Sequence, residues 1–460
     1  MRLVLSFVVG SLALCACGSG HEPTGGVGPV GSTRPASHDP PLATGSLSVT
    51  DDEPYAAKRT ACRYRRGALP AETFGPSIAG AELPIDTIVI VSQENRSFDE
   101  YFGQLPEAGQ PDVDVENPQV VLRSGKGVPF TPFHESELCT GDPLHDWNSM
   151  HLDWDRGKND GFVRVNPTLG GGALGYFDQG DLGFYYGLAT TYAISDAYFA
   201  AVLGPTWTNR DYLYAGTSLG RLVNGESLPA DQPTIFTRLA DADVSFGVYS
   251  NAPPGVVTAG CPGPYSHETE QFCDQIPGGA KDLAAFRAAA AAGTLPHVSW
   301  IYAGNDEHPP ADIQQGEADV QLFFDAFAAS PQWSKGAFIL TYDENGGFYD
   351  HVAPPAACLP DEVRPDLTAG DLPGAFNRYG FRLPFILASP YAKPHFVSHA
   401  ANSHTSVLRF LELLFDLPAC SDRDANADPL LDFFDFSHPS FPKAAVFPPV
   451  IVANPSRRGC

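Results

Sequence analysis

The sequence predicts an α/β protein with a central, mostly parallel β-sheet sandwiched by helices. Five short apolar runs have the length and the β-branched and aromatic content of buried strands. These runs are Thr87–Val91, Val244–Tyr249, Val298–Tyr302, Ala337–Tyr342 and Pro384–Ala388. Helical patterns lie between several of them, and strands that alternate with helices are typical of a parallel sheet covered on both faces.

Three stretches carry the helical patterns. Leu283–Ala292 is rich in alanine, and Asp282 before it is a suitable N-cap. Asp312–Ala329 and Ser403–Phe415 have apolar residues at helical spacing. A further stretch, Arg210–Ser218, can be helical and follows a Gly-Pro turn.

The chain divides into three parts in this interpretation. Residues 1–17 have the short apolar core of a signal peptide, and the segment that ends in Cys17 resembles a bacterial lipobox. Residues 18–57 read as a disordered tether rich in Gly, Pro and Ser. Residues 58–460 form a single domain, and its Pro-rich end after residue 417 is expected to wrap the surface. We therefore expect an exported protein, lipid-anchored at the bacterial cell envelope or otherwise secreted.

Composition excludes one class of partner. The chain has 460 residues and a formal net charge of −26, and its 28 Lys and Arg residues form no cluster. Nucleic-acid binding needs such a cluster to neutralise the phosphate backbone, so nucleic acid is not expected as a partner. A phosphorylated substrate is still possible, because a bound metal ion can overcome the global repulsion. The oligomeric state is not predicted.

Seven cysteines follow Cys17, and an exported protein is expected to form disulfides from them. The pairs expected first are Cys261 with Cys273, which bracket a short loop, and Cys358 with Cys420. Because seven is odd, at least one thiol stays free or pairs between chains.

The first candidate site segment follows the strand at Thr87–Val91. Glu94, Asn95 and Arg96 come at its carboxyl end, and ligands in open α/β sheets bind beyond the strand ends. A carboxylate, an amide oxygen and a guanidinium suit a divalent cation with an anion beside it. Asp343 and Glu344 follow the strand at Ala337–Tyr342 in the same way. Both can reach one ion if the chain bends there, as Gly346-Gly347 permits.

Thr206 is the candidate nucleophile. It follows a Gly-Pro turn and precedes a possible helix, and the positive end of a helix dipole stabilises an alkoxide and attracts an anion. The alternative is that Thr206 is only a helix cap, which is the commoner role of such a threonine. His145, His308 and His404 each lie in a polar segment. Together they could bind phosphoryl oxygens and protonate a leaving group.

These motifs resemble the bacterial phosphoesterase family that includes phosphatidylcholine-preferring phospholipases C and an acid phosphatase branch. The Glu-Asn-Arg-Ser-Phe-Asp string at 94–99 is the most specific of them. The others follow in order at residues 145–147, 160–162, 204–210, 306–309, 342–351 and 403–406. The resemblance covers residues 83–416. One departure is Thr208, where the family commonly has proline.

The resemblance implies a fold like that of alkaline phosphatase and the sulfatases, and it implies a role for each site residue. Thr206 would be phosphorylated during turnover, and His145, His308 and His404 would surround the phosphoryl group or the leaving oxygen. Asn209 and Arg210 are expected to bind the phosphate. One divalent metal ion, which could be Ca²⁺, Mg²⁺, Mn²⁺ or Zn²⁺, would be held by Glu94, Asn95, Thr206, Asp343 and Glu344.

Three functions are compatible with these residues. The chain could be a phospholipase C that acts on glycerophospholipids, which is the preferred hypothesis, or a broad-specificity acid phosphatase. It could also be a non-catalytic surface lipoprotein. The last is disfavoured because each motif position holds a chemically competent residue.

Overall fold

The computed structural model describes residues 53–75, 80–116, 119–225, 228–229, 231–250, 276 and 279–453. The expected signal peptide, the lipobox and the Cys261–Cys273 pair lie outside these residues. Helix α1 (Glu53–Thr60) begins inside the stretch expected to be a tether, so ordered structure begins before residue 58.

A seven-stranded sheet forms the centre of the fold, in the order β12-β6-β11-β10-β1-β9-β8. The strands are β1 (Thr87–Gln93), β6 (Ala193–Ser195), β8 (Phe246–Ser250), β9 (Val298–Tyr302), β10 (Gly336–Tyr342), β11 (Ile386–Ala388) and β12 (Phe396–Ser398). Only β11 is antiparallel to its neighbours, and the remaining pairs are parallel. The mostly parallel sheet is confirmed. Strands β6 and β12, which have only three residues each, were not predicted.

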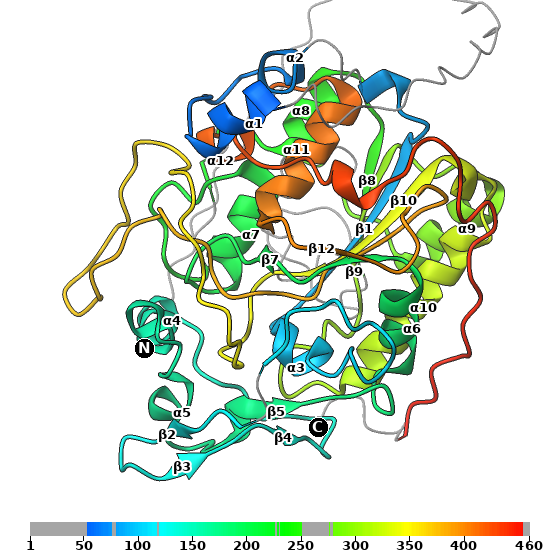
Figure 1. Cartoon of the computed structure of the whole chain (residues 1–460). Coiled ribbons are helices and arrows are strands. Elements are labelled where there is room, and N and C mark those ends of the chain that lie inside the picture. Colours follow the sequence, from blue (N-terminus) through cyan, green and yellow to red (C-terminus); the bar gives the residue numbers. More distant parts are fainter. Residues whose placement is uncertain are drawn as a thin grey trace, which may run out of the picture. The chain divides into compact units, whose positions relative to one another are not determined.

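Helices cover both faces of the sheet (Figure 1). Trp300 of β9 contacts the rings of Tyr214 in α7 (Thr206–Ala215) and Phe236 in α8 (Ile235–Asp241). On the opposite face, Tyr249 of β8 contacts Phe286 of α9 (Leu283–Ala292). Helix α10 (Ile313–Ala328) packs beside α9 and contacts α6 (Gly183–Thr191), while α11 (His404–Phe415) packs beside α7.

The helix predictions hold for three elements and need a correction at the fourth. Asp282 and Asp312 cap α9 and α10, since each side chain accepts a hydrogen bond from a first-turn backbone N–H. Helix α7, however, begins at Thr206 rather than at Arg210. Pro205 holds the N-cap position and Thr206 makes no capping bond, so the interpretation of Thr206 as a cap is wrong.

A small lobe adjoins the main sheet, and we call residues 119–174 the hairpin lobe. It contains the hairpin of β2 (Leu122–Arg123) and β3 (Pro129–Phe130), and the helices α4 (Trp147–Trp154) and α5 (Phe162–Val165). The lobe lies at the lower left of Figure 1. Leu122, Met150 and Phe162 belong to a separate small core that holds these elements together.

The other elements are short or connect the main ones. They are α2 (Pro70–Thr73), η2 (Gly80–Glu82), α3 (Phe98–Phe102), β4 (Phe133–His134), η3 (Asp155–Gly157), η4 (Gly172–Leu174), β5 (Gly175–Tyr176), β7 (Tyr198–Phe199), η6 (Pro331–Lys335), β13 (Asn402–Ser403), α12 (Asp422–Ala425) and η7 (Leu431–Phe433). Among the described residues, no helix is both long and apolar enough to cross a membrane. After residue 433, the chain packs Phe441 and Phe447 against the main core. This packing agrees with the prediction that the Pro-rich end of the chain wraps the surface.

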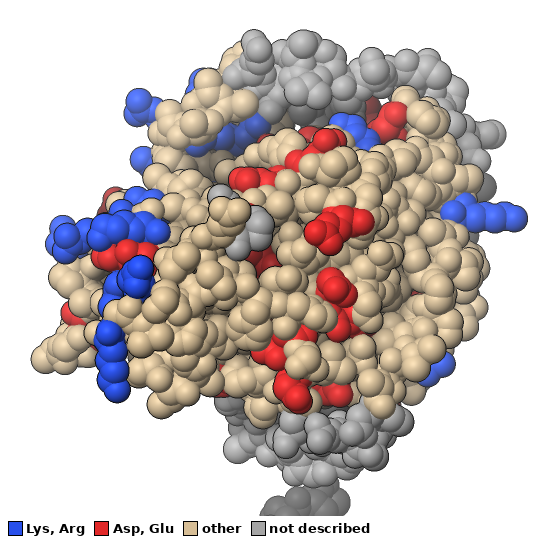
Figure 2. Space-filling view, turned by 60° about the horizontal axis from the view of Figure 1, so that its bottom comes forward, with Lys and Arg blue, Asp and Glu red and all other residues tan. Residues whose placement is uncertain are grey.

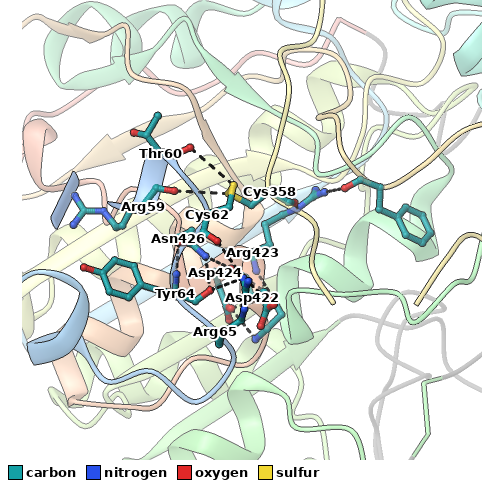
Figure 3. The surroundings of a disulfide bond; sticks show 12 residues. Arg59, Thr60, Cys62, Tyr64, Arg65, Cys358, Asp422, Arg423, Asp424 and Asn426 are labelled. Atoms are coloured by element: carbon teal, nitrogen blue, oxygen red, sulfur yellow. Dashed lines mark hydrogen bonds and ion pairs between the residues drawn. A yellow bond between two sulfur atoms is a disulfide. The ribbon is translucent and has the colours of Figure 1, made fainter. Parts of the chain in front are cut away.

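The disulfide predicted between Cys358 and Cys420 is wrong. Cys358 is bonded to Cys62, which is 296 residues away in the sequence (Figure 3). The segment after α1 lies against α12, where the backbone N–H of Tyr64 donates to Asn426 Oδ1, and this contact brings Cys62 to Cys358. Cys420 is a buried free thiol, as the odd number of cysteines requires, and Cys139 also takes part in a disulfide.

Candidate active site

The carboxyl ends of β1, β10 and β9 bring the predicted strand-end residues together. In register, Gln93 lies beside Tyr342, so Glu94 and Asp343 leave the sheet at the same edge. The backbone N–H of Asn95 donates to Asp343 Oδ1 at 3.3 Å. The N–H of Glu94 donates to the carbonyl of Asp306 at 2.7 Å, which ties the segment after β9 to the same place.

Two glycines let the loop after β10 pass close to its neighbours. Gly346 has φ +61°, and a Cβ there would lie 2.5 Å from the carbonyl oxygen of Asn95. Gly347 has φ +70°, and its Cβ would lie 2.5 Å from the carbonyl oxygen of Leu144. Only glycine fits at these two places. The predicted bend therefore exists, and it brings Glu344 beside Asn95 and the segment of His145.

Helix α7 meets this edge through Arg210. The Arg210 guanidinium lies 2.8 Å from Glu94 Oε1 through Nη2, and 3.3 Å from Asp343 Oδ2 through Nε. Thr206 is the first residue of α7 and precedes Arg210 by four residues, so both lie on one face of the helix. Side chains on a helix lean towards its N-terminus. The Arg210 guanidinium therefore extends towards the turn that begins with Thr206, and it contacts Glu94 and Asp343 there.

The oxygens of this cluster fit a bound cation. Asn95 Oδ1 and Glu344 Oε1 are buried and have no hydrogen-bond partner among the described residues. Burial raises the pKa of Asp343, and burial together with the charge of Asp343 raises the pKa of Glu344 well above its usual range. With Glu94, Asp343 and Glu344 ionised, Arg210 leaves two net negative charges, which one divalent ion neutralises. Buried unpartnered oxygen atoms are the ligand type that hard divalent cations select.

His145 and His308 lie together on the open side of the cluster, with ring centres 5.8 Å apart. Each ring is oriented by a backbone carbonyl: His145 Nδ1 lies 2.8 Å from the oxygen of Pro143, and His308 Nδ1 lies 2.6 Å from that of Pro309. With Nδ1 protonated in each ring, Nε2 is left for the site. His145 Nε2 accepts from Asn95 Nδ2 at 3.2 Å and lies 3.8 Å from Glu344 Oε1.

His404 lies at the same edge but is enclosed by protein. Its Nε2–H donates to the carbonyl of Asp343 at 2.6 Å, and its Nδ1 lies 3.1 Å from the Tyr198 hydroxyl. Burial lowers the pKa of His404 to about 4, so the ring is neutral. Asn209 is similarly engaged: its Oδ1 accepts from Val202 N, and its Nδ2 donates to Gly204 O. Contact of His404 or Asn209 with a phosphoryl group stays a prediction.

Glu307, for which no role was predicted, organises the segment before His308. Its buried carboxylate accepts four hydrogen bonds, from Gln93 Nε2 and from the hydroxyls of Tyr101, Tyr185 and Tyr342. Its carbonyl oxygen accepts two more from the Arg96 guanidinium. Arg96 is thus a buried scaffold residue. The Asp-Glu-His string at 306–308 was a visible signal, but its three-tyrosine shell comes from three separate segments.

Asp142 is a second residue of the candidate site for which no role was predicted. Its Oδ1 lies 3.5 Å from His145 Nδ1, and one potential ligand atom from each of Asp142, His145 and His308 fits within 4.8 Å. The sequence places Asp142 three residues before His145, which is the signal that could have indicated it.

The fold and the site define a class of protein. The site combines a hydroxyl at a helix start, a buried cluster of carboxylates suited to a divalent ion, and a histidine pair. These groups are suited to transfer of a phosphoryl group from an ester to water. The chain belongs to the Phosphoesterase family, whose model matches residues 85–418. It is a hydrolase that acts on phosphoric ester bonds.

Curated relatives are 30–32% identical to the chain over the aligned segments. Phospholipase C A from Mycobacterium tuberculosis is 32% identical over 407 residues, which cover 77% of this chain and 78% of the relative. Hemolytic phospholipase C from Pseudomonas aeruginosa is 32% identical over 76% of this chain and 55% of its own length. Non-specific phospholipase C4 from Arabidopsis thaliana is 30% identical over 73% of this chain and 68% of its own length.

A solved structure of a protein in the alkaline phosphatase superfamily from Vibrio parahaemolyticus also matches. It has a TM-score of 0.40 and 10% identity over 82% of this chain and 78% of that chain. The fold class rests on the sheet order and on the helices over both faces.

Proposed function

We propose that this chain is a metal-dependent phosphoesterase of phospholipase C type, which cleaves glycerophospholipids through a phosphorylated Thr206. The observation that carries the proposal is the position of Thr206 at the start of α7, one turn before the arginine that binds Glu94 and Asp343. The names of the curated relatives favour a phospholipid over other phosphate esters.

Glu94, Asn95, Asp343, Glu344 and the Thr206 hydroxyl would hold the metal ion. A bound divalent ion there supplies positive charge that lowers the pKa of the hydroxyl and offsets its repulsion from the phosphate. Thr206 also lies at the first position of α7, where unpaired backbone N–H groups and the helix dipole stabilise negative charge. These contributions explain why a threonine, a weak nucleophile in water, can attack here.

The reaction takes two steps. The Thr206 hydroxyl loses its proton to a water molecule, and Oγ1 forms a bond to phosphorus while the bond from phosphorus to the diacylglycerol oxygen breaks. A protonated histidine donates a proton to that oxygen. Water then attacks the phosphothreonine, the now neutral histidine takes one proton from this water, and the bond from phosphorus to Oγ1 breaks. The phosphorylated headgroup leaves, and Oγ1 takes a proton from solvent to restore the hydroxyl. We assign proton donation to His308, because the one hydrogen bond that its ring makes among the described residues is through Nδ1. His145 is already engaged by Asn95.

His404 and Asn209 would act as positioning residues. His404 fixes the backbone of Asp343, and Asn209 fixes the loop of residues 202–205 that leads into Thr206. Arg210 would offset part of the negative charge of the metal-binding carboxylates. The phosphate would contact the metal, the histidines and the start of α7 instead of Arg210.

Replacement of the nucleophile tests this proposal. Thr206→Val keeps the side-chain shape but removes the hydroxyl, so turnover should fall by about 10³-fold or more while the unfolding temperature stays near that of wild type. The substrates are phosphatidylcholine, a soluble choline phosphodiester and an aryl phosphate monoester. Preference for the diesters supports a phospholipase C, whereas preference for the monoester would favour an acid phosphatase.

A matched control lies on the same helix. Thr208 is buried, and its Oγ1 donates to the carbonyl of Arg221 at 3.5 Å. Thr208→Val makes the same chemical change away from the site and should retain most of the activity. Normal turnover by Thr206→Val, or an equal loss in Thr208→Val, would refute the assignment of the nucleophile.

A further inference from the structure

The hairpin lobe exposes apolar side chains on a short segment. Val121, Val128 and Phe133 are 46%, 48% and 39% exposed. Burial of Leu122 against the lobe core directs its neighbours Val121 and Arg123 to the outer face of the hairpin, since adjacent strand residues point to opposite faces. Residues 125–129 at the turn are all exposed. Single exposed apolar residues are common, but several on one hairpin mark a surface for interaction.

Basic side chains accompany these apolar ones. Arg123, Lys126 and Arg156 are exposed and have no ion-pair partner among the described residues, whereas Lys158 and Arg164 pair with Asp155 and Asp160. Arg164 lies by the hairpin turn, because its Cγ is 4.0 Å from the position that a Cβ would take at Gly125. In Figure 2, Lys and Arg gather on the left, the side where Figure 1 shows the lobe, and Asp and Glu gather in the centre.

We propose that the hairpin lobe docks on the surface of an anionic phospholipid bilayer, with Val121, Val128 and Phe133 entering the interface and Arg123, Lys126 and Arg156 contacting lipid phosphates. Apolar residues mixed with Lys and Arg are the combination that binds membrane interfaces. The occupant follows from charge complementarity: the chain carries a net charge of −26, yet residues 119–134, which include the hairpin, contain Arg123 and Lys126 and no acidic residue. An anionic surface therefore attracts the hairpin and repels the acidic remainder of the chain, which sets the orientation of the molecule.

This docking surface would serve the proposed function, on which the inference rests. The lobe carries His145 itself, in the segment before α4, and Leu144 beside it is 53% exposed. Docking through the hairpin would bring the active-site edge and its rim to the lipid headgroups. The enzyme would thus find its substrate in a membrane rather than as single lipid molecules.

Vesicle binding by the full chain tests the proposal. Each protein carries Thr206→Val, to keep the lipids intact, and Cys17→Ser, to remove acylation as a route to the membrane. The vesicles are phosphatidylcholine alone or an equal mixture with phosphatidylglycerol. A lysine or arginine near an anionic surface contributes about fivefold in binding. Arg123→Gln with Lys126→Gln should therefore weaken binding to the mixed vesicles by about tenfold or more, and added salt should weaken binding by the unmodified hairpin.

The apolar residues have their own variant and control. Val121→Ser with Val128→Ser should weaken binding to both vesicle types, whereas Val363→Ser with Leu367→Ser, at exposed apolar positions outside the lobe, should not. With Thr206 intact, both hairpin variants should retain wild-type turnover of a soluble choline phosphodiester. Failure of the wild-type chain to cleave any diester would refute the proposed function but would leave the binding result valid. Absence of vesicle binding by the parent chain, or an equal loss in the Val363 and Leu367 control, would overturn the docking proposal.

Discussion

Two buried clusters of acids and arginine lie on adjoining segments of this chain, and they differ in how fully their polar atoms are bonded. The first is the strand-end cluster of Glu94, Asn95, Asp343, Glu344 and Arg210. The second, which we call the Arg382 cluster, contains Asp99, Asp350, His351 and Arg382. Unpartnered buried oxygens occur in the first and not in the second. Motif composition alone does not separate a ligand site from a structural network, but hydrogen-bond saturation does.

The polar atoms of the Arg382 cluster are hydrogen-bonded to one another and to nearby backbone. The guanidinium donates to Asp350 and Asp99 and to the carbonyl oxygens of Asp114 and Asp196. The second oxygen of Asp99 accepts from the backbone N–H and the ring of His351. Buried carboxylates bonded in this way hold loops together.

The largest expected effect is on activity, from Glu344→Gln in the strand-end cluster. The substitution keeps the shape but removes one charge facing the proposed metal, so turnover should fall by about 10²–10³-fold. Burial and Asp343 raise the pKa of Glu344, which means that its ionised form is costly in the metal-free protein. The metal-free variant should therefore unfold at the same temperature as wild type or higher. A loss of stability with activity unchanged would show that Glu344 is structural.

Arg382→Gln should have the opposite outcome. Removing one partner from a buried, hydrogen-bonded ion pair leaves Asp99 and Asp350 uncompensated and typically costs about 3–5 kcal/mol. Urea denaturation measures this loss, and turnover per folded molecule at low temperature should stay near the wild-type value. Wild-type stability together with a large loss of turnover would place Arg382 in the active site.

A smaller expected effect is the pH dependence of the stability that His351 contributes in the Arg382 cluster. Burial lowers the pKa of His351, but the Asp99 carboxylate outweighs it, and the pKa is raised from 6.5 to about 9. Protonated His351 therefore stabilises the folded chain. This contribution should be complete below about pH 6.5 and should be lost as the pH rises through about 9. The difference in unfolding free energy between wild type and His351→Gln should shrink over that range. A constant difference would contradict the assigned ion pair.

Local rules were enough to predict where several residues of the candidate site lie in the fold. Apolar strands followed by acids located Glu94 and Asp343, and the Gly-Pro turn placed Thr206 near a helix start. Contacts between distant segments were beyond local rules. Three features depend on tertiary packing. They are the pairing of Cys62 with Cys358, the shell of tyrosines around Glu307, and the ion pairs of Arg210 with the acids that follow β1 and β10. Strands β6 and β12 are too short to give a periodic signal.

Metal content tests the difference between the strand-end cluster and the Arg382 cluster most directly. Wild type, Asp343→Asn and Asp350→Asn are each purified without chelators, incubated with Ca²⁺, Mg²⁺, Mn²⁺ and Zn²⁺ in turn, desalted and analysed for bound metal by mass spectrometry. The two substitutions are chemically identical, one in each cluster. We predict one divalent ion per chain in wild type and in Asp350→Asn, and a loss of that ion in Asp343→Asn. Equal metal content in all three proteins, or metal lost only from Asp350→Asn, would contradict the account.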